Sequence, residues 1–457
     1  MIDAVLKQID ANREATIAGL KELLTIPSVS TKPEHKDDLR RCAAWIADKL
    51  NAMGLKAHVR QTGGHPAVVA KNEHKPGRPT ILFYGHYDVQ PPEPLDKWLT
   101  PPFEPTIRDG AIYARGAVDD KGQVWAHLQA IAAWERNGGL PVNITLLIEG
   151  EEEIGSDNLE KFVRDNRDEL KADVALISDT NQYARGLPAI TYGLRGLVYT
   201  EVFITAADHD THSGLYGGAI PNPANILCAA LGSLHDADQK VTVPGFYDDV
   251  VPLSQSERDA WAKLPFDEKK FLSDLKIDAA MGEKGYSATE RSWARPTCDI
   301  NGITSGYQGY GAKTIIPSNA SAKVSMRLVP NQDPVKIVES FEKMIRERCP
   351  KGVKIEFARH GLSAPVLVSR EGRAMHLATE AVRQGFGATP TLIRSGGTIP
   401  VVGLIKSTLG IDTLLVGFGL PDDRVHSPNE KFDLDALHAG TRTAAALYAQ
   451  LAGLHAL

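Results

Sequence analysis

The spacing of apolar residues along the first part of the chain predicts helices that alternate with buried strands. Apolar positions recur with a helical period in residues 1–24 and 37–53, and again in 122–137 and 158–170. Continuous apolar runs, which are typical of buried strands, occur at 67–72, 80–85, 142–150 and 172–179. This alternation predicts a largely parallel sheet that helices cover on both faces.

The pattern changes near residue 193, where half-exposed strands replace fully buried ones. Residues 197–206 alternate between apolar and polar positions, as in a strand with one exposed face. Further strands are predicted at 321–330 and 353–359, and helices at 222–234 and 334–348. The simplest arrangement of these pieces is a small antiparallel sheet with both helices on one face. Residues 236–311 show no pattern that we can assign in detail.

Beyond about residue 365 the strand–helix alternation returns, with a helix predicted at 373–384 and a strand at 412–419. We therefore predict an α/β fold whose first domain is discontinuous, formed by residues 1–193 and 366–457. Residues 194–365 would form an inserted α+β domain. The length of 457 residues also favours two domains, because it exceeds what one hydrophobic core usually holds.

Composition and charge narrow the possible functions. Apolar residues make up 42% of the chain and charged residues 24%, as in ordinary globular proteins. The net charge of −6 and the lack of a dense Lys/Arg run argue against a nucleic-acid partner. The four cysteines are far apart and do not indicate a disulfide framework. Residues 1–24 resemble neither a signal peptide nor a membrane span, so we expect a cytoplasmic protein without a membrane partner.

Acidic residues and histidines cluster where the predicted strands end. They are His86 and Asp88, Asp119 and Asp120, the glutamates of residues 149–153, Asp179 and, in a later turn, His426. In an open α/β sheet the binding crevice lies outside the carboxyl ends of the strands. These side chains are therefore expected to converge in one crevice.

Converging carboxylates would repel one another strongly unless cations lay between them. A mixture of imidazole and carboxylate ligands without thiolates suits zinc and also allows manganese or cobalt. The set exceeds the needs of one tetrahedral ion, which favours two ions bridged by a carboxylate, with a bridging water as nucleophile.

Each stretch taken alone also has a structural explanation. The strand-end histidine could be satisfied by an ordinary hydrogen bond, the glutamates could form a solvated turn, and the paired aspartates could cap a helix. All of these explanations would have to hold together by coincidence, so a metal site is the better interpretation.

Five motifs carry a family resemblance: GHYDVQP at 85–91, ARGAVDDKG at 114–122, EGEEEIGS at 149–156, HSGLYGG at 212–218 and HSPNE at 426–430. In this order and spacing they resemble the motif set of the di-zinc peptidases that include carnosinases, cytosolic non-specific dipeptidases and aminoacylases. The spacing is close to that of the dipeptidase branch.

The resemblance implies a ligand role for five residues of the first domain. His86 and Asp179 would bind one zinc ion, Glu153 and His426 would bind the other, and Asp119 would bridge the two.

Three further residues would serve this centre. Asp88 would accept a hydrogen bond from the ring of His86 and fix its tautomer. Asp120 would lie beside the ligands, and the Asp119–Asp120 peptide bond would be cis. Glu152 would be the general base, taking a proton from the bridging water and delivering it to the leaving amine.

The inserted domain resembles the family's lid and dimerisation module. In such a homodimer His212 would reach the partner's active site and donate to the oxyanion, and Thr314 would come from the same lid. Arg327, His360 and Thr398 match positions that hold the substrate's carboxylate. The lid would close around the substrate.

One motif departs from the dipeptidases, which read EGGSIP where this chain reads SGGTIP at 395–400. Thr398 keeps the hydroxyl near the substrate carboxylate, but Ser395 replaces a charged residue. The preference for the substrate's N-terminus therefore stays open.

The sequence thus predicts a di-zinc dipeptidase for dipeptides or short peptides with a free C-terminal carboxylate. An N-acyl-amino-acid amidohydrolase would share the metal site and differ in the acyl pocket. A non-catalytic binding relative would be favoured by loss of Glu152 or of a zinc ligand, and none is lost. A di-metal phosphoesterase lacks support, because no basic or glycine-rich phosphate cradle accompanies the acids.

Overall fold

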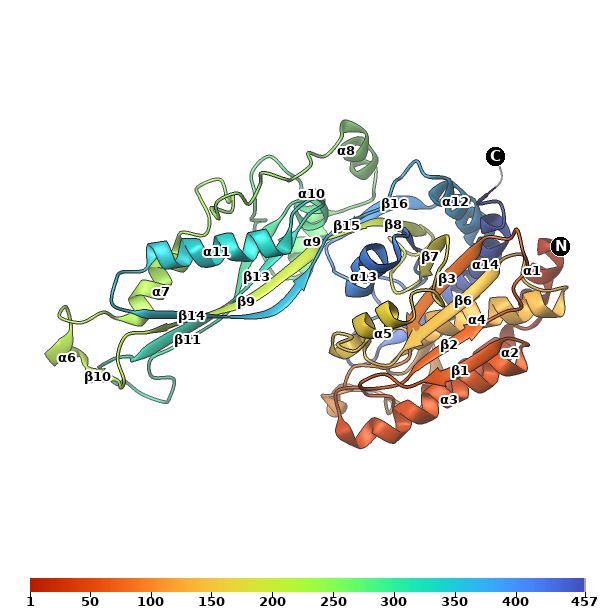
Figure 1. Cartoon of the computed structure of the whole chain (residues 1–457), viewed down its shortest axis with the longest axis horizontal. Helices are drawn as coiled ribbons and strands as arrows, with labels where there is room; N and C mark the ends of the chain where they lie inside the picture. The colour runs from red at the N-terminus through yellow and green to blue at the C-terminus, as the bar shows by residue number, and fades with distance from the viewer. Residues whose placement is uncertain (456–457) are drawn as a thin grey trace. The chain divides into compact units, whose positions relative to one another are not determined.

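The computed structural model describes residues 1–455, which form two compact units (Figure 1). The first unit comprises Met1–Tyr192, Val368–Ile393 and Leu404–Leu457, and the second comprises Gly193–Leu367 and Arg394–Gly403. The sequence pattern assigns residues 394–403 to the first domain, whereas the structure groups them with the second unit.

Polar contacts explain why this segment belongs to the second unit. The Nε of Arg195 donates to the carbonyl oxygen of Gly396 at 3.0 Å, and the hydroxyl of Thr398 donates to the carbonyl oxygen of Arg195 at 2.6 Å. Neither contact leaves a periodic signal in the sequence, so pattern reasoning could not find them.

The first unit is built on a mixed sheet in the order β1-β2-β6-β3-β7-β17-β8. The four central strands, β6, β3, β7 and β17, are parallel, which confirms the predicted α/β fold. The outer strands β1, β2 and β8 pair antiparallel, and β15 and β16 extend the sheet beside β8. The strands are β1 Lys56–Arg60, β2 Ala67–Lys71, β3 Thr80–His86, β6 Asn143–Glu149, β7 Val174–Ile177, β8 Ala189–Leu194, β15 Val366–Leu367, β16 Thr391–Ser395 and β17 Thr413–Leu415.

Helices pack on this sheet, and α4 is the most deeply buried of them because it is apolar around most of its surface. It contacts β3 and the helix α14, while α3 packs on β1 and β2. The apolar stretch at 1–24 forms two helices with a break at Asn12 rather than one. The helices are α1 Ile2–Ala11, α2 Arg13–Leu24, α3 Lys36–Ala52, α4 Lys121–Arg136, α5 Leu159–Asp165, α12 Arg373–Phe386, α13 Pro400–Leu409 and α14 Leu434–Leu451, with short 3₁₀ turns η1 Pro33–His35 and η2 Leu95–Lys97.

A small three-stranded sheet in the order β18-β5-β4 joins distant parts of the first unit. Its strands are β4 Thr106–Arg108, β5 Ala111–Tyr113 and β18 Lys431–Asp433. This pairing fixes the turn before β18 next to the turn that follows β5.

The second unit contains a four-stranded antiparallel sheet in the order β11-β13-β9-β14, with α7 and α11 packed against it (Figure 1). Side chains alternate along β13: Val324 and Met326 are fully buried under the helices, whereas Ser325 and Arg327 lie on the other face. This arrangement confirms the predicted α+β insertion. The elements are β9 Gly196–Thr205, β11 Thr297–Ser305, β13 Asn319–Leu328, β14 Lys354–Ser363, α7 Pro223–Gly232 and α11 Pro334–Arg348.

The stretch at 236–311 that resisted assignment contains α8 Gln255–Ala262, α9 Glu268–Asp274 and α10 Ala288–Ala294 before it enters β11. Ser254 and Ser287 begin two of these helices, and each forms a capping box with a glutamate three residues later. At one end of the unit, β10 Thr211–His212 pairs with β12 Ile315–Ile316 and leads into the short α6 Ser213–Tyr216.

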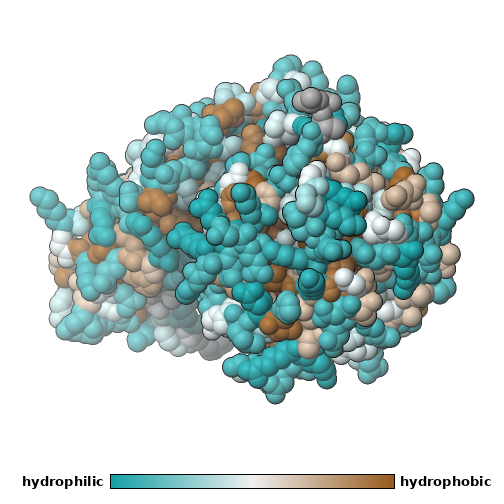
Figure 2. All heavy atoms as spheres, turned by 45° about the vertical axis from the view of Figure 1, so that its right-hand side comes forward, coloured by the Kyte–Doolittle hydropathy of each residue, from teal (hydrophilic) through white to brown (hydrophobic). Residues whose placement is uncertain are grey.

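Hydrophilic side chains cover most of the face shown in Figure 2, and hydrophobic residues appear there only in small groups. Within residues 1–455, none of the helices combines the length and the hydropathy that a membrane crossing requires.

Candidate metal centre

His86 is the last residue of β3 and is fully buried. Its Nδ1 lies 3.1 Å from the backbone carbonyl oxygen of Asp88, which can only accept a hydrogen bond. The proton of the neutral ring therefore sits on Nδ1, and Nε2 presents its lone pair. This Nε2 is buried, lies 3.1 Å from Asp119 Oδ1 and has no hydrogen-bond partner, as expected of a metal ligand.

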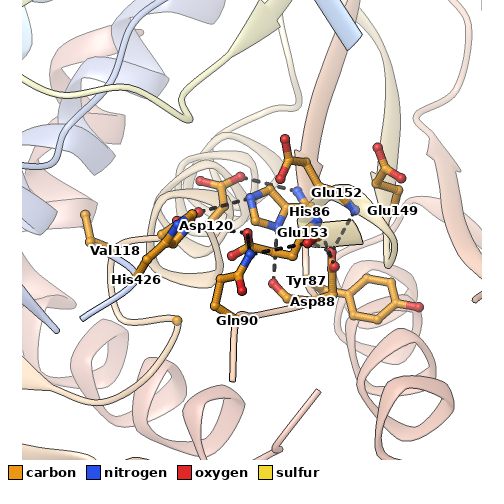
Figure 3. Close-up of polar contacts among 12 residues, drawn as sticks. His86, Tyr87, Asp88, Gln90, Val118, Asp120, Glu149, Glu152, Glu153 and His426 are labelled. Atoms are coloured by element: carbon orange, nitrogen blue, oxygen red, sulfur yellow. Dashed lines mark hydrogen bonds and ion pairs between the residues drawn. The ribbon is translucent and has the colours of Figure 1, made fainter. Parts of the chain in front are cut away.

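Both the backbone carbonyl oxygen and the carboxylate of Asp88 lie near Nδ1 of His86. The carboxylate Oδ1 lies 3.4 Å from Nδ1 of His86, farther than the carbonyl oxygen. The two carboxylate oxygens also accept from the backbone N–H groups of Glu152 at 3.2 Å and Glu153 at 3.1 Å. Asp88 thus joins the end of β3 to the glutamate turn (Figure 3).

The glutamate turn follows β6 and includes the 3₁₀ turn η3, Glu152–Ile154. Two of its glutamates are buried and bonded to neighbours. Glu149 accepts from the hydroxyl groups of Tyr84 at 2.5 Å and Ser156 at 2.9 Å, and Glu151 accepts from the side-chain amide of Asn158 at 3.0 Å. These bonds fix both ends of the turn, a division of roles that the sequence alone did not reveal.

The next two glutamates are placed differently. Among residues 1–455, no side chain or backbone group forms a hydrogen bond or ion pair with the carboxylate of Glu152. Glu153 accepts from Nε2 of Gln90 at 2.8 Å and lies 3.2 Å from Nε2 of His426. Glu152 thus has a free carboxylate, and Gln90, a residue of the GHYDVQP motif, orients Glu153.

Asp119 lies in the turn between β5 and α4, which a buried carboxylate holds in place. Glu430 accepts from Arg115 Nη1 at 2.7 Å and from the N–H groups of Gly116, Val118 and Asp119 at 3.0, 3.0 and 3.1 Å. Gly116 adopts a φ of 81°, which favours glycine. Sequence reasoning did not single out Glu430, although it is the last residue of the HSPNE motif.

The peptide bond between Asp119 and Asp120 is cis, as the family resemblance implies. Asp120 is buried, and its Oδ2 accepts from the backbone N–H of His86 at 3.3 Å. Its Oδ1 has no hydrogen-bond partner.

The five predicted ligands come together in two groups that share one carboxylate. His86, Asp119 and Asp179 form one group, and Asp119, Glu153 and His426 form the other, each with its ligand atoms within 4.8 Å of one another. His426 Nε2 is 2.9 Å from Asp119 Oδ2. The donor set consists of imidazole nitrogens and carboxylate oxygens, which suits two divalent cations of the zinc or manganese type.

The electrostatics of this cluster point the same way. Burial and neighbouring carboxylates raise the pKa of Asp179 to about 7 and that of Glu152 to about 8. Hydrogen bonds to Asp119 and Glu153 raise the pKa of His426 to about 10. The raised pKa values show that these three groups bind protons more strongly than usual, because the cluster has an excess of negative charge. Divalent cations would supply the positive charge instead of protons.

The second unit places Arg327 beside Thr398, with Nη1 of the arginine donating to the threonine hydroxyl at 2.8 Å. His360 is separate from this pair. Its Nε2 lies 3.2 Å from Glu201 Oε2, and its ring is 5.2 Å from that of Tyr199.

His212 and Thr314 are exposed near the paired strands β10 and β12. Nδ1 of His212 accepts from the N–H of Gly214 at 3.0 Å, so the neutral ring carries its proton on Nε2. The carbonyl oxygen of Thr314 accepts from the N–H of Ser213 at 3.1 Å. His212 therefore has an N–H available for donation to another molecule.

Comparison with known proteins places this geometry in context. Residues 82–450 match the model of Peptidase family M20/M25/M40. The chain is 33% identical to the Beta-Ala-His dipeptidase of Homo sapiens, over 100% of this chain and 94% of that protein. It is 30% identical to the Cys-Gly metallodipeptidase dug1 of Schizosaccharomyces pombe, over 96% of each chain. The structure also resembles the M20 family metallo-carboxypeptidase Sso-CP2 from Sulfolobus solfataricus, with a TM-score of 0.86, 34% identity and coverage of 96% and 99%.

Proposed function

This chain belongs to Peptidase family M20/M25/M40, and we propose that it is a di-metal dipeptidase. Its substrates would be dipeptides or short peptides with a free C-terminal carboxylate. The observation that carries this proposal is the pair of three-ligand groups that share Asp119, next to the unbonded carboxylate of Glu152.

We assign His86, Asp119 and Asp179 to one cation and Asp119, Glu153 and His426 to the other. The orphaned Nε2 of His86 and the raised pKa of Asp179 support this assignment. Zinc is the first choice, with manganese or cobalt as alternatives. When bound, two such cations lower the pKa of water and polarise the scissile carbonyl.

Glu152 would be the general base. Its carboxylate is half-buried and free of other hydrogen bonds, so it can accept a proton from the attacking water and pass it to the leaving amine. Glu153 would not replace it, because hydrogen bonds to Gln90 and His426 already engage that carboxylate. Asp88 would hold both glutamates in position through their backbone N–H groups.

The second unit would bind the substrate's carboxylate and complete the partner's site. Arg327, whose guanidinium fork suits a carboxylate, would act together with Thr398 and His360. The exposed Nε2–H of His212 would donate to the oxyanion in the partner subunit of a homodimer, with Thr314 beside it. We also propose a cytoplasmic location, with which the four free cysteines agree.

A substrate panel tests this proposal on the zinc- or manganese-loaded chain. We expect cleavage of β-Ala-His, Cys-Gly and other free dipeptides, abolished by a chelator and restored by the metal. Faster hydrolysis of N-acetylated amino acids than of free dipeptides would instead identify an N-acyl-amino-acid amidohydrolase. If the metal-loaded protein hydrolysed neither free dipeptides nor N-acetylated amino acids, the chain would be a non-catalytic relative.

A further inference from the structure

The two buried arginines of the second unit are each neutralised by a buried glutamate. Arg295 donates to both carboxylate oxygens of Glu283 at 2.6 and 2.7 Å. Arg394 forms an ion pair with Glu257. The fold thus provides a carboxylate wherever it buries a guanidinium group fully, as the cost of an unpaired buried charge requires.

Arg195 and Arg327 differ from these two arginines both in burial and in their hydrogen-bond partners. Both are half-buried, and no carboxylate among residues 1–455 lies within 4.0 Å of either guanidinium group. Their hydrogen bonds go to neutral oxygens instead. Arg195 donates to the carbonyl oxygens of Gly396 at 3.0 Å and Arg295 at 3.4 Å, and Arg327 donates to the hydroxyl of Thr398 at 2.8 Å.

One short loop brings the two cations together. Gly396 and Thr398 are two residues apart, and the Thr398 hydroxyl that accepts from Arg327 also donates to the backbone carbonyl of Arg195. The first residue of the SGGTIP motif, Ser395, is uncharged, and its hydroxyl accepts a hydrogen bond from the N–H of Gly397 at 3.1 Å. The loop therefore holds two positive charges and supplies no negative one.

The lack of a carboxylate partner is accompanied by a lowered pKa of both guanidinium groups. Burial, followed by the charge of Arg327, lowers the pKa of Arg195 to about 10, and burial also lowers the pKa of Arg327. The carboxylate of Asp299, which is exposed, partly offsets both charges from beyond ion-pair distance. A single bound carboxylate would neutralise one cation and leave the other without a partner.

We propose that Arg195 and Arg327 together form a site for two carboxylates, so that the preferred dipeptides end in aspartate or glutamate. This inference rests on the proposed function, in which Arg327 binds the α-carboxylate. Arg195 then faces the side-chain carboxylate as a specificity-determining residue. Guanidinium groups suit both contacts because their planar forks match carboxylate oxygens.

Arg195 could alternatively serve only to hold the loop through its bonds to Gly396 and Arg295. Two substitutions of Arg195 distinguish the effect of its positive charge from its structural support of the loop. Arg195→Gln removes the charge, whereas Arg195→Lys keeps it and loses the fork. Arg359→Gln is the matched control, because Arg359 lies in the same unit and pairs with Glu342 on the surface.

The first experiment measures kcat/KM for Ala-Glu and Ala-Gln with the metal-loaded chain. We expect the native chain to prefer Ala-Glu by about 10-fold or more, mainly through KM, and Arg195→Gln to reduce this preference to about 2-fold. Arg195→Lys should keep part of the preference, and Arg359→Gln should keep all of it. Equal rates for both dipeptides, or an equal loss on both in Arg195→Gln, would show that Arg195 only supports the loop.

A binding experiment tests the inference without measuring turnover. Calorimetry on the chelator-treated chain compares L-glutamate with L-glutamine, which differ only in the side-chain carboxylate. We expect glutamate to bind about 10-fold more tightly, and the difference to vanish in Arg195→Gln. Equal affinities, or no binding of either amino acid, would overturn the inference. Failure to cleave any dipeptide together with selective glutamate binding would instead contradict only the proposed dipeptidase function.

Discussion

The proposed metal centre of the first unit gathers carboxylates with few cations, whereas the loop at residues 396–398 of the second unit gathers arginines without carboxylates. Six carboxylates surround two histidines in the first case: Asp88, Asp119, Asp120, Glu152, Glu153 and Asp179, with His86 and His426. In the second, Arg195 and Arg327 bond only to neutral oxygens. Each region is short of the charge that its proposed ligand would bring.

Two buried charge pairs elsewhere in the chain are each satisfied within the fold. Glu430 binds Arg115 and three backbone N–H groups, and Glu283 binds Arg295 through both oxygens. In these two pairs the opposite charges hold the fold, whereas in the acid-rich centre and at the arginine loop we propose that a ligand supplies the missing charge. Substitutions in the two kinds of site should therefore affect different quantities.

The largest effect is expected from Glu152→Gln. The substitution removes the proposed base but no proposed ligand, so turnover should fall by about 1,000-fold while metal content stays unchanged. The free energy of unfolding of the metal-free chain should not fall, because one carboxylate leaves a cluster that is already rich in them. Turnover, metal analysis and denaturant unfolding measure the three quantities, and undiminished turnover would refute the role of Glu152.

Glu430→Gln should show the opposite profile. It leaves the guanidinium of Arg115 buried without its carboxylate, which should lower the free energy of unfolding of the metal-free chain by about 3 kcal/mol or more. Urea titration measures the loss, with Glu73→Gln as a control that changes an exposed glutamate. A loss no larger than that of the control would contradict a structural role for the Arg115–Glu430 pair.

His212→Ala tests the proposed contribution of the second unit to the partner's site. Turnover should fall by about 100-fold because an oxyanion donor is lost, with metal content unchanged. Mixed dimers with Glu152→Gln chains should regain activity, since each has one site with both residues intact. Random mixing predicts about one quarter of the native activity. No recovery, once mixed dimers are shown to form, would rule out the shared site.

A smaller effect should come from a buried group that has neither an ionic partner nor a ligand. His127 lies between the hydroxyl groups of Tyr448 at 2.9 Å and Ser178 at 2.7 Å, and burial lowers its pKa from 6.5 to about 3. Protonation therefore favours the unfolded state, so the stability that the neutral ring provides is complete above pH 6.5 and is lost as the pH falls.

Between pH 6.5 and pH 5 this loss should be about 2 kcal/mol. Urea titrations of the native chain and of His127→Gln at both values measure it, since only the native chain contains this titrating group. The difference in stability between the two proteins should shrink toward pH 5. A difference that does not change with pH would mean that burial does not lower the pKa of His127 in the folded chain.

Local sequence patterns were sufficient to predict the central strands and the carboxylates at their ends. His86 and Asp179 follow apolar runs, so their convergence with Asp119 could be expected from the topology of a parallel sheet. Glu430 could not be found in this way, because its four donors lie more than 300 residues earlier in the chain.

The same limit applies to the second unit. The placement of residues 394–403 depends on hydrogen bonds to Arg195, some 200 residues away. The helices that begin after Ser254 and Ser287 did have a local signal, since both follow the S-x-x-E capping pattern. Their short lengths and weak apolar periods made that signal easy to miss.

The most direct test of the central account is the number of divalent cations that the acid-rich centre binds. The chelated chain is dialysed against zinc, and the bound metal is measured by elemental analysis for the native protein and for Asp119→Asn. We predict two ions per native chain, with β-Ala-His or Cys-Gly cleavage restored in parallel, and loss of both ions when the shared carboxylate is replaced. A native chain that binds no zinc, or that keeps its zinc after Asp119→Asn, would contradict the account.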